Sequence, residues 1–321
     1  MVVRFISALA LMTLPVSCAE APEPSRNTAT HNCEYGSAQS LGPTVNSSVF
    51  DGSPTVSADE TELFFTSARH PTAGRGQQDI FVSRRSDRNA PWSGPVNAGA
   101  MINDPIGDDF SLRLSNDGKA LYYASNRSGG FGRGDLYVAR RASPEAPWSR
   151  AENLGPPLNT DAFEGFPTPS ADGLTLFFDR STTFDSQDSD IWVSTRVRAD
   201  DQWSAPQRVT GTINSGRAEF SPALSPDGNR LYFASERGGS VELWIAMRRG
   251  HTQEWSAPEK LGIEVNFPRS MTVAPFITND QRSLYFMSAR QDLVAAEACT
   301  PGTCFDRLDL YVSTVTCREQ Q

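Results

Sequence analysis

Residues 221–237 read SPALSPDGNRLYFASER, a pattern that returns four more times along the 321-residue chain. Apolar and polar residues alternate on both sides of the Asp227-Gly228 pair. Alternation around an Asp-Gly turn predicts a β-hairpin. The other copies occupy residues 53–69, 111–127, 166–180 and 274–290. The turn aspartates of the five copies are spaced by 58, 55, 55 and 53 residues and are Asp59, Asp117, Asp172, Asp227 and Asp280.

Two further strand signals follow each hairpin. A third strand begins with an acid and alternates apolar and aromatic residues, starting at Asp79, Asp135, Asp190, Glu242 and Asp309. A Trp-Ser element, a short apolar strand and an asparagine come next, with the asparagines at Asn103, Asn159, Asn214 and Asn266. Four strands in each of five repeats predict an all-β, five-bladed β-propeller with four-stranded blades. A linear solenoid would need polar caps at both ends, and the repeats have none.

The N-terminal part of the chain predicts how the ring closes. Tyr35 stands six residues before Leu41, the spacing found between each recurrent tryptophan and the strand after it, and Asn46 matches the asparagine series. Residues 33–46 therefore resemble a fourth strand without the first three, and residues 274–317 resemble three strands without a fourth. We expect the N-terminal strand to complete the last blade and to remove two open sheet edges.

The cysteines suit this closure. In the repeat register Cys33 and Cys317 fall close together across the seam, which predicts a disulfide, and Cys299 and Cys304 predict a second one within a loop. Cys18 is left over. Paired cysteines are typical of an oxidising compartment. A zinc site is the competing interpretation, but the chain has three histidines and no CxxC pair.

The first 32 residues do not resemble folded core. Residues 1–18 have an Arg followed by a short apolar run, as in a signal segment, and end in LPVSC, which resembles a bacterial lipoprotein signal with Cys18 as the acylated residue. An ordinary signal-peptidase cut near Cys18 is the alternative. Residues 19–32 are polar and Pro-rich and predict a flexible tether. The single propeller domain then spans residues 33–317, with a tail at 318–321, and we expect an exported protein of the periplasm or outer membrane.

The SPALSPDGNRLYFASERGG pattern resembles the WD-repeat-like blades of the TolB-type family of bacterial envelope proteins. The resemblance extends over residues 35–317. It implies the propeller fold but not an activity, because blades of this type serve both binding proteins and enzymes.

Candidate binding residues recur once per blade. Eight residues before each turn aspartate stand Asp51, Asp109, Glu164, Glu219 and Thr272. The second strand returns to the same end and delivers Arg69, Arg127, Arg180, Arg237 and Arg290. We expect these residues to surround one mouth of the central channel, where surplus acid would suit Ca²⁺, a cationic group or sugar hydroxyls. Because the pattern repeats in every blade, it favours an architectural role over a catalytic one, in which an arginine between two carboxylates, within or between blades, satisfies all three groups.

Composition narrows the function. A net charge of −9 argues against nucleic-acid binding, which needs a basic face. No GxSxG nucleophile motif is present. The leading hypothesis is a monomeric, non-enzymatic envelope protein without a cofactor. It would bind a protein partner or a cell-wall glycan through the acidic mouth and would touch the membrane only through its lipid anchor. The alternative is a carbohydrate-active enzyme that uses Asp109 with Glu164 or Glu219, one as acid and the other as nucleophile or base.

Overall fold

The recurrent hairpin forms the two innermost strands of every blade in the computed structural model, which describes residues 33–69, 78–183, 187–250, 254–268, 270–289 and 308–317. A Ser or Thr two residues before each turn aspartate donates its hydroxyl to that carboxylate, as Ser225 does to Asp227. The same carboxylate accepts the backbone N–H two residues further on. The turn is therefore specified locally, by side chain to backbone bonds.

Four antiparallel strands build each blade, and their bounds follow the repeat. The first blade contains β3 (Asp51–Val56), β4 (Glu62–Ser67), β5 (Asp79–Arg84) and β6 (Val96–Asn97). The second contains β7 (Asp109–Leu114), β8 (Ala120–Ser125), β9 (Asp135–Arg140) and β10 (Glu152–Asn153). The third contains β11 (Phe163–Pro169), β12 (Thr175–Ser181), β13 (Asp190–Thr195) and β14 (Gln207–Arg208). The fourth contains β15 (Glu219–Leu224), β16 (Arg230–Ser235), β17 (Glu242–Met247) and β18 (Glu259–Lys260).

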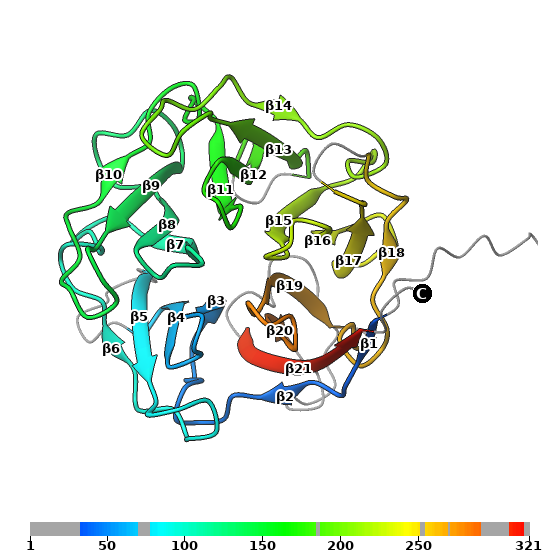
Figure 1. The fold of residues 1–321 in the computed structure, drawn as a ribbon, viewed down its shortest axis with the longest axis horizontal. Coiled ribbons are helices and arrows are strands. Elements are labelled where there is room, and N and C mark those ends of the chain that lie inside the picture. The colour runs from blue at the N-terminus through cyan, green and yellow to red at the C-terminus, as the bar shows by residue number, and fades with distance from the viewer. Residues whose placement is uncertain are drawn as a thin grey trace, which may run out of the picture. The chain divides into compact units, whose positions relative to one another are not determined.

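The fifth blade joins the two ends of the described chain. It contains β19 (Met271–Ile277), β20 (Ser283–Ala289) and β21 (Asp309–Cys317), with β1 (Cys33–Tyr35) and β2 (Gln39–Ser40) along the outer edge of β21. Figure 1 shows the five sheets arranged radially, with β3, β7, β11, β15 and β19 innermost. The predicted five-bladed propeller with an N-terminal closing strand is confirmed.

The hydrophobic core lies between the blades. Each second strand carries two consecutive aromatic residues, and successive side chains of a strand point to opposite faces of the sheet. Phe64 accordingly packs with Tyr123 of the next blade, and Phe65 packs with Phe286 of the fifth blade. All four rings of these two junctions are inaccessible to solvent. Burying such a side chain is worth about 1.5–3 kcal/mol, so the junctions stabilise the ring substantially.

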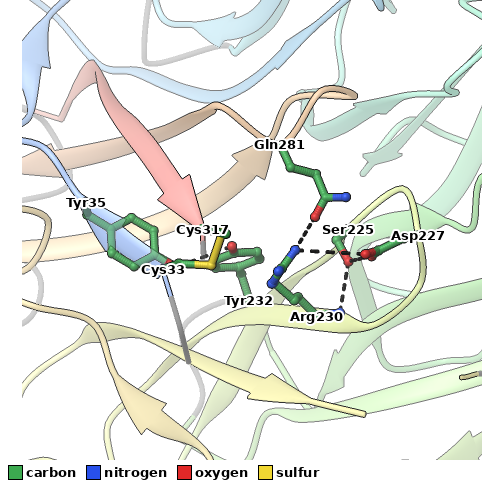
Figure 2. The surroundings of a disulfide bond; sticks show 8 residues. All are labelled: Cys33, Tyr35, Ser225, Asp227, Arg230, Tyr232, Gln281 and Cys317. Carbon is green, nitrogen blue, oxygen red and sulfur yellow. Dashed lines mark hydrogen bonds and ion pairs between the residues drawn. A yellow bond between two sulfur atoms is a disulfide. The ribbon is translucent and has the colours of Figure 1, made fainter. Parts of the chain in front are cut away.

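The seam of the ring contains the predicted disulfide. Cys33 pairs with Cys317 across β1 and β21, and their sulfur atoms are bonded. Figure 2 shows the bond beside Tyr35, whose hydroxyl donates to that of Tyr232 at 3.3 Å, and near the contact of Arg230 with Gln281. The second predicted pair, Cys299–Cys304, lies outside the described residues, as do Cys18, the signal segment, the tether and the tail.

Every innermost strand contains a β-bulge at the same place. In β7 the register shifts between Phe110 and Arg113, and Ser111 has a φ of 56°. The other four inner strands have a positive-φ residue at the matching position, with φ between 46° and 53°. Because a bulge changes which way the following side chain points, it decides which residues face the space enclosed by the five innermost strands. Across the described ranges, the structure contains no helix with the length and apolar character needed to span a membrane.

Candidate functional site

The predicted acids gather where the innermost strands begin, and we call this end of the propeller the ring face. The opposite end, which carries the aspartate turns, is the turn face. Asp51, Asp109 and Glu219 are the first residues of their strands, and Glu164 and Thr272 are the second residues of theirs. The four acids are 0% exposed and Thr272 is 1% exposed. These residues therefore lie at one end of the ring, as expected from the sequence, but their side chains are buried within the protein and are not exposed at its surface.

An arginine of the same blade pairs with each buried acid. Arg69 contacts Asp51 at 2.5 Å, Arg180 contacts Glu164 at 2.8 Å, and the remaining pairs are Arg127–Asp109 and Arg237–Glu219. Each arginine also donates to a backbone carbonyl in the segment that enters the blade, at Val45, Ile102, Leu158 and Ile213. Arg290 lies outside the described residues.

The second oxygen of each acid holds the loop that leads into its strand. The backbone N–H of Asp104 donates to Asp109 at 2.6 Å, and the N–H of Ser215 donates to Glu219 at 2.6 Å. Ser47 and Thr160 make the same bond to Asp51 and Glu164. Burial is the main influence on the pKa of Asp109, which it raises to about 6, whereas Arg127 and the loop amide favour the ionised form. In each of these carboxylates one oxygen therefore pairs with an arginine, and the other accepts a bond from the backbone of the loop and fixes that loop.

The third-strand acids take other partners, which corrects the expectation that each arginine lies between two carboxylates. Asp79 and Asp135 accept bonds from Asn97 and Asn153, both at 2.8 Å. Asp190 and Glu242 instead form ion pairs, with Arg208 and Lys260 respectively. The fourth strand of each of these blades therefore supplies the partner of the third-strand acid. Among the described residues, no group of three or more His, Cys, Asp or Glu side chains is arranged to hold a metal ion.

Blade three departs from the symmetry of the other blades. Its repeat is two residues shorter at the end of the second strand, so Arg180 stands opposite Glu164, where Ser125 stands opposite Asp109 in blade two. The residue before it, Asp179, is 3% exposed and accepts the N–H of Ser221 from blade four at 2.9 Å. Its Oδ1 is buried without a partner in the described residues. Asp179 was not among the residues predicted from the sequence, although the shortened repeat is a visible signal.

Asp179 should make stability depend on pH. Burial raises the pKa of its carboxyl to about 7, with a smaller contribution from the charge of Glu164, against an ordinary value of about 3.9. Between about pH 4 and pH 7 the folded protein then binds more protons than the unfolded chain, so stability falls as the pH rises through this window.

We expect Asp179→Asn to lose this part of the pH dependence. The variant should be more stable than the natural protein above pH 7 and similar to it below about pH 4, with about 1.4 kcal/mol for each unit of pKa shift. Urea unfolding at several pH values measures the difference. Asp109 and Asp309, whose pKa values burial also raises, are present in both proteins and cancel. Parallel pH profiles for the two proteins would contradict the assignment.

The recurrent asparagines and tryptophans are visible in the sequence, but their roles become clear only in the structure. Each recurrent asparagine clamps the third strand with both ends of its amide: Asn103 accepts the N–H of Ile80 and donates to its carbonyl, both at 2.9 Å. An arginine seven residues before each tryptophan stacks on that ring at 4.1–4.4 Å, in the pairs Arg85–Trp92, Arg141–Trp148, Arg196–Trp203 and Arg248–Trp255. Both devices are architectural.

A groove on the turn face lies between the first two blades and has a volume of about 750 Å³. Its walls include Trp148, Pro144 and Arg84. Inside it Arg84 and Arg141 both pair with Glu62. Asp59 and Asp117, which also line the groove, accept the bonds of their own turns.

Exposed apolar side chains gather at the ring face. Ile106 is 81% exposed and Phe131 is 54% exposed, and both belong to loops of blade two at this end. Asp108 and Asn126 bond these two loops together through three hydrogen bonds. Met101, in the same connection as Ile106, is exposed as well, and two other connections at this end expose Val49 and Ile263. The ring face therefore combines fixed loops with apolar tips.

Comparison with known proteins agrees with the fold and leaves the activity open. No family model and no curated protein matches the chain. The catalytic domain of the Coprinopsis cinerea GH62 α-L-arabinofuranosidase is similar in structure, with a TM-score of 0.60 at 11% identity over 89% of this chain and 98% of that one. An α-L-arabinofuranosidase from Podospora anserina gives 0.58 at 12% identity over 88% and 97%. A TolB structure from Agrobacterium tumefaciens gives 0.47 at 15% identity over 88% and 99%. At these identities the likeness concerns the propeller fold alone.

Proposed function

We propose that this protein is a non-enzymatic binding propeller that takes its partner on the ring face. The observation that carries the proposal is the state of four acids of the ring face, which we call the ring acids: Asp51, Asp109, Glu164 and Glu219. Each is fully buried and already bonded to an arginine and to the backbone of its loop. A carboxylate in this state cannot reach a substrate, but it can hold a loop in one conformation. A preorganised loop loses less entropy when it binds a partner.

The exposed groups of the ring face favour an envelope protein over a cell-wall glycan. Ile106 and Phe131 present apolar surface on two loops that Asp108 and Asn126 bond together. Exposed apolar surface rimmed by polar residues is typical of protein interaction sites. Glycan binding remains the second form of the same proposal, with Phe131 as the stacking residue.

The test compares two faces of one molecule. We expect Ile106→Ser with Phe131→Ser to weaken binding at least tenfold, because the loss of two interface anchors typically costs more than 1 kcal/mol each. The matched control is Val197→Ser, which changes a residue that is 84% exposed on the turn face. Pull-downs from envelope extract and glycan arrays would be run with all three proteins. Equal binding by the natural protein and the double variant would refute the ring-face proposal.

Export completes the proposal. A disulfide at the seam suits an oxidising compartment. We propose that residues 1–18 direct export and that Cys18 carries the lipid anchor. Mass spectrometry of the mature N-terminus distinguishes an acylated Cys18 from a free one.

A glycosidase is the second candidate, and Asp179 is the observation that favours it. Burial, with a smaller contribution from the charge of the neighbouring Glu164, raises the pKa of Asp179 to about 7, which suits a general acid. The enzymes of similar fold act on arabinofuranosides. Release of arabinose from an arabinofuranosyl oligosaccharide, whose sugar leaving group needs protonation, would establish this activity if Asp179→Asn abolished it. No release by the natural protein would exclude that substrate.

A further inference from the structure

Arg113 joins two blades that are not neighbours. It belongs to β7 of the second blade, and its Nη2 donates to the carbonyl of Pro275 in β19 of the fifth blade at 2.8 Å. In Figure 1, β3 of the first blade lies between β7 and β19. The Arg113 side chain therefore crosses the space enclosed by the five innermost strands, which we call the ring interior.

The other blades place no charge at this position. The residue after the bulge faces an aromatic residue of the second strand in every blade, and the four counterparts of Arg113 are Thr55, Thr168, Ala223 and Phe276. A single cation thus breaks the five-fold pattern. Because the bulge directs this side chain, the arginine cannot simply turn outward to solvent.

Arg113 has no anionic partner in the described residues. It is 7% exposed, its guanidinium lies 5.0 Å from the centre of the Phe276 ring, and its Nε is buried without a hydrogen-bond acceptor. Burial lowers its pKa to about 9, so the group is still charged at neutral pH. An aromatic ring and one carbonyl compensate little of the cost of burying a charge, which usually requires an opposite charge.

We propose that the ring interior binds a small monovalent anion, such as chloride, beside the Arg113 guanidinium. Nη1 is the nitrogen open to it, because Nη1 has no partner in the described residues and is not fully buried. A carboxylate would prefer two parallel N–H bonds. The Nε edge is closed and Nη2 is committed to Pro275, so a spherical halide fits better.

The experiment measures stability in halide. Unfolding temperature is recorded in sodium chloride and sodium bromide, each replaced stepwise by sodium gluconate at constant ionic strength. Above the dissociation constant we expect a rise of about 3 °C for each tenfold increase in halide. Arg113→Met should abolish this rise. Arg208→Met, which removes an arginine that is paired with Asp190 at the surface, should retain it.

A second measurement needs no variant. Anomalous diffraction from bromide-soaked crystals of the natural protein should show a bromide next to the Arg113 guanidinium. The proposal is overturned if the natural protein shows no halide-specific rise, if Arg113→Met shows the same rise, or if bromide is absent from the ring interior.

Discussion

Replacing both cysteines of the seam, Cys33→Ser with Cys317→Ser, is expected to lower the free energy of unfolding by roughly 5 kcal/mol. The two residues are 284 positions apart, so the bond closes nearly the whole domain into one loop. In the chain-entropy account a longer loop gives a larger stabilisation, because the cross-link removes more freedom from the unfolded chain. The loss should appear as an unfolding midpoint lowered by at least 10 °C.

The architecture of the seam strengthens this expectation. The closing strands β1 and β2 are only three and two residues long. The fifth blade also lacks the arginine–tryptophan stack of the other four, because Val315 and Tyr35 stand at the corresponding positions. The disulfide therefore adds a covalent link to the hydrogen bonds that hold the N-terminal strands on β21, which include those of Asn46 with Leu310.

Urea unfolding under oxidising conditions measures the effect. The matched control is Cys299→Ser with Cys304→Ser, the pair predicted to close a short loop, for which the same account gives a loss of about 2 kcal/mol. If the Cys33–Cys317 variant lost no more stability than this control, the seam bond would not be the closure of the ring.

Prediction from sequence succeeded where the structure is a repetition of local patterns. The spacing of Tyr35, Leu41 and Asn46 matched the other repeats, and the structure gives Leu41 and Asn46 the bonds of their counterparts. Gly36, next to Tyr35, bonds to Thr314 as Ser149 bonds to Arg140. Register is specified strongly in such strands because a one-residue slip would turn every apolar side chain to the wrong face.

Prediction failed where the outcome depends on distances in space. Alignment placed the acids at one end of the ring, but it could not show whether they face solvent or the interior, because the bulge that turns the inner strand is not encoded by a distinctive residue. Its positive-φ position is occupied by Ser53, Ser111, Phe166, Ser221 and Ala274. Asp179 and Arg113 were missed for a related reason: their importance comes from burial without a full set of partners.

The ring acids lead to the second large prediction. Arg127→Met should lower the free energy of unfolding by about 3–5 kcal/mol, because it leaves the fully buried Asp109 without its counter-charge. Arg127 also donates to the Ile102 carbonyl at 2.7 Å and to the Tyr123 hydroxyl at 3.0 Å. The matched control is Arg208→Met at the exposed pair with Asp190, where we expect a loss below about 1 kcal/mol. Urea unfolding at neutral pH measures both.

The pH dependence and a double variant separate charge from packing. Without Arg127 the pKa of Asp109 should rise further above about 6, so the loss in Arg127→Met should shrink on acidification, as the carboxyl becomes neutral. Adding Asp109→Asn to Arg127→Met should recover part of the stability at neutral pH, because no charge is then left buried. A loss that is independent of pH, and that Asp109→Asn leaves unchanged, would mean that Arg127 stabilises the loop through its carbonyl bond and its packing alone. Asp109 would then not act as the counter-charge of Arg127, and the proposal that ion pairs fix the ring acids would fail at this pair.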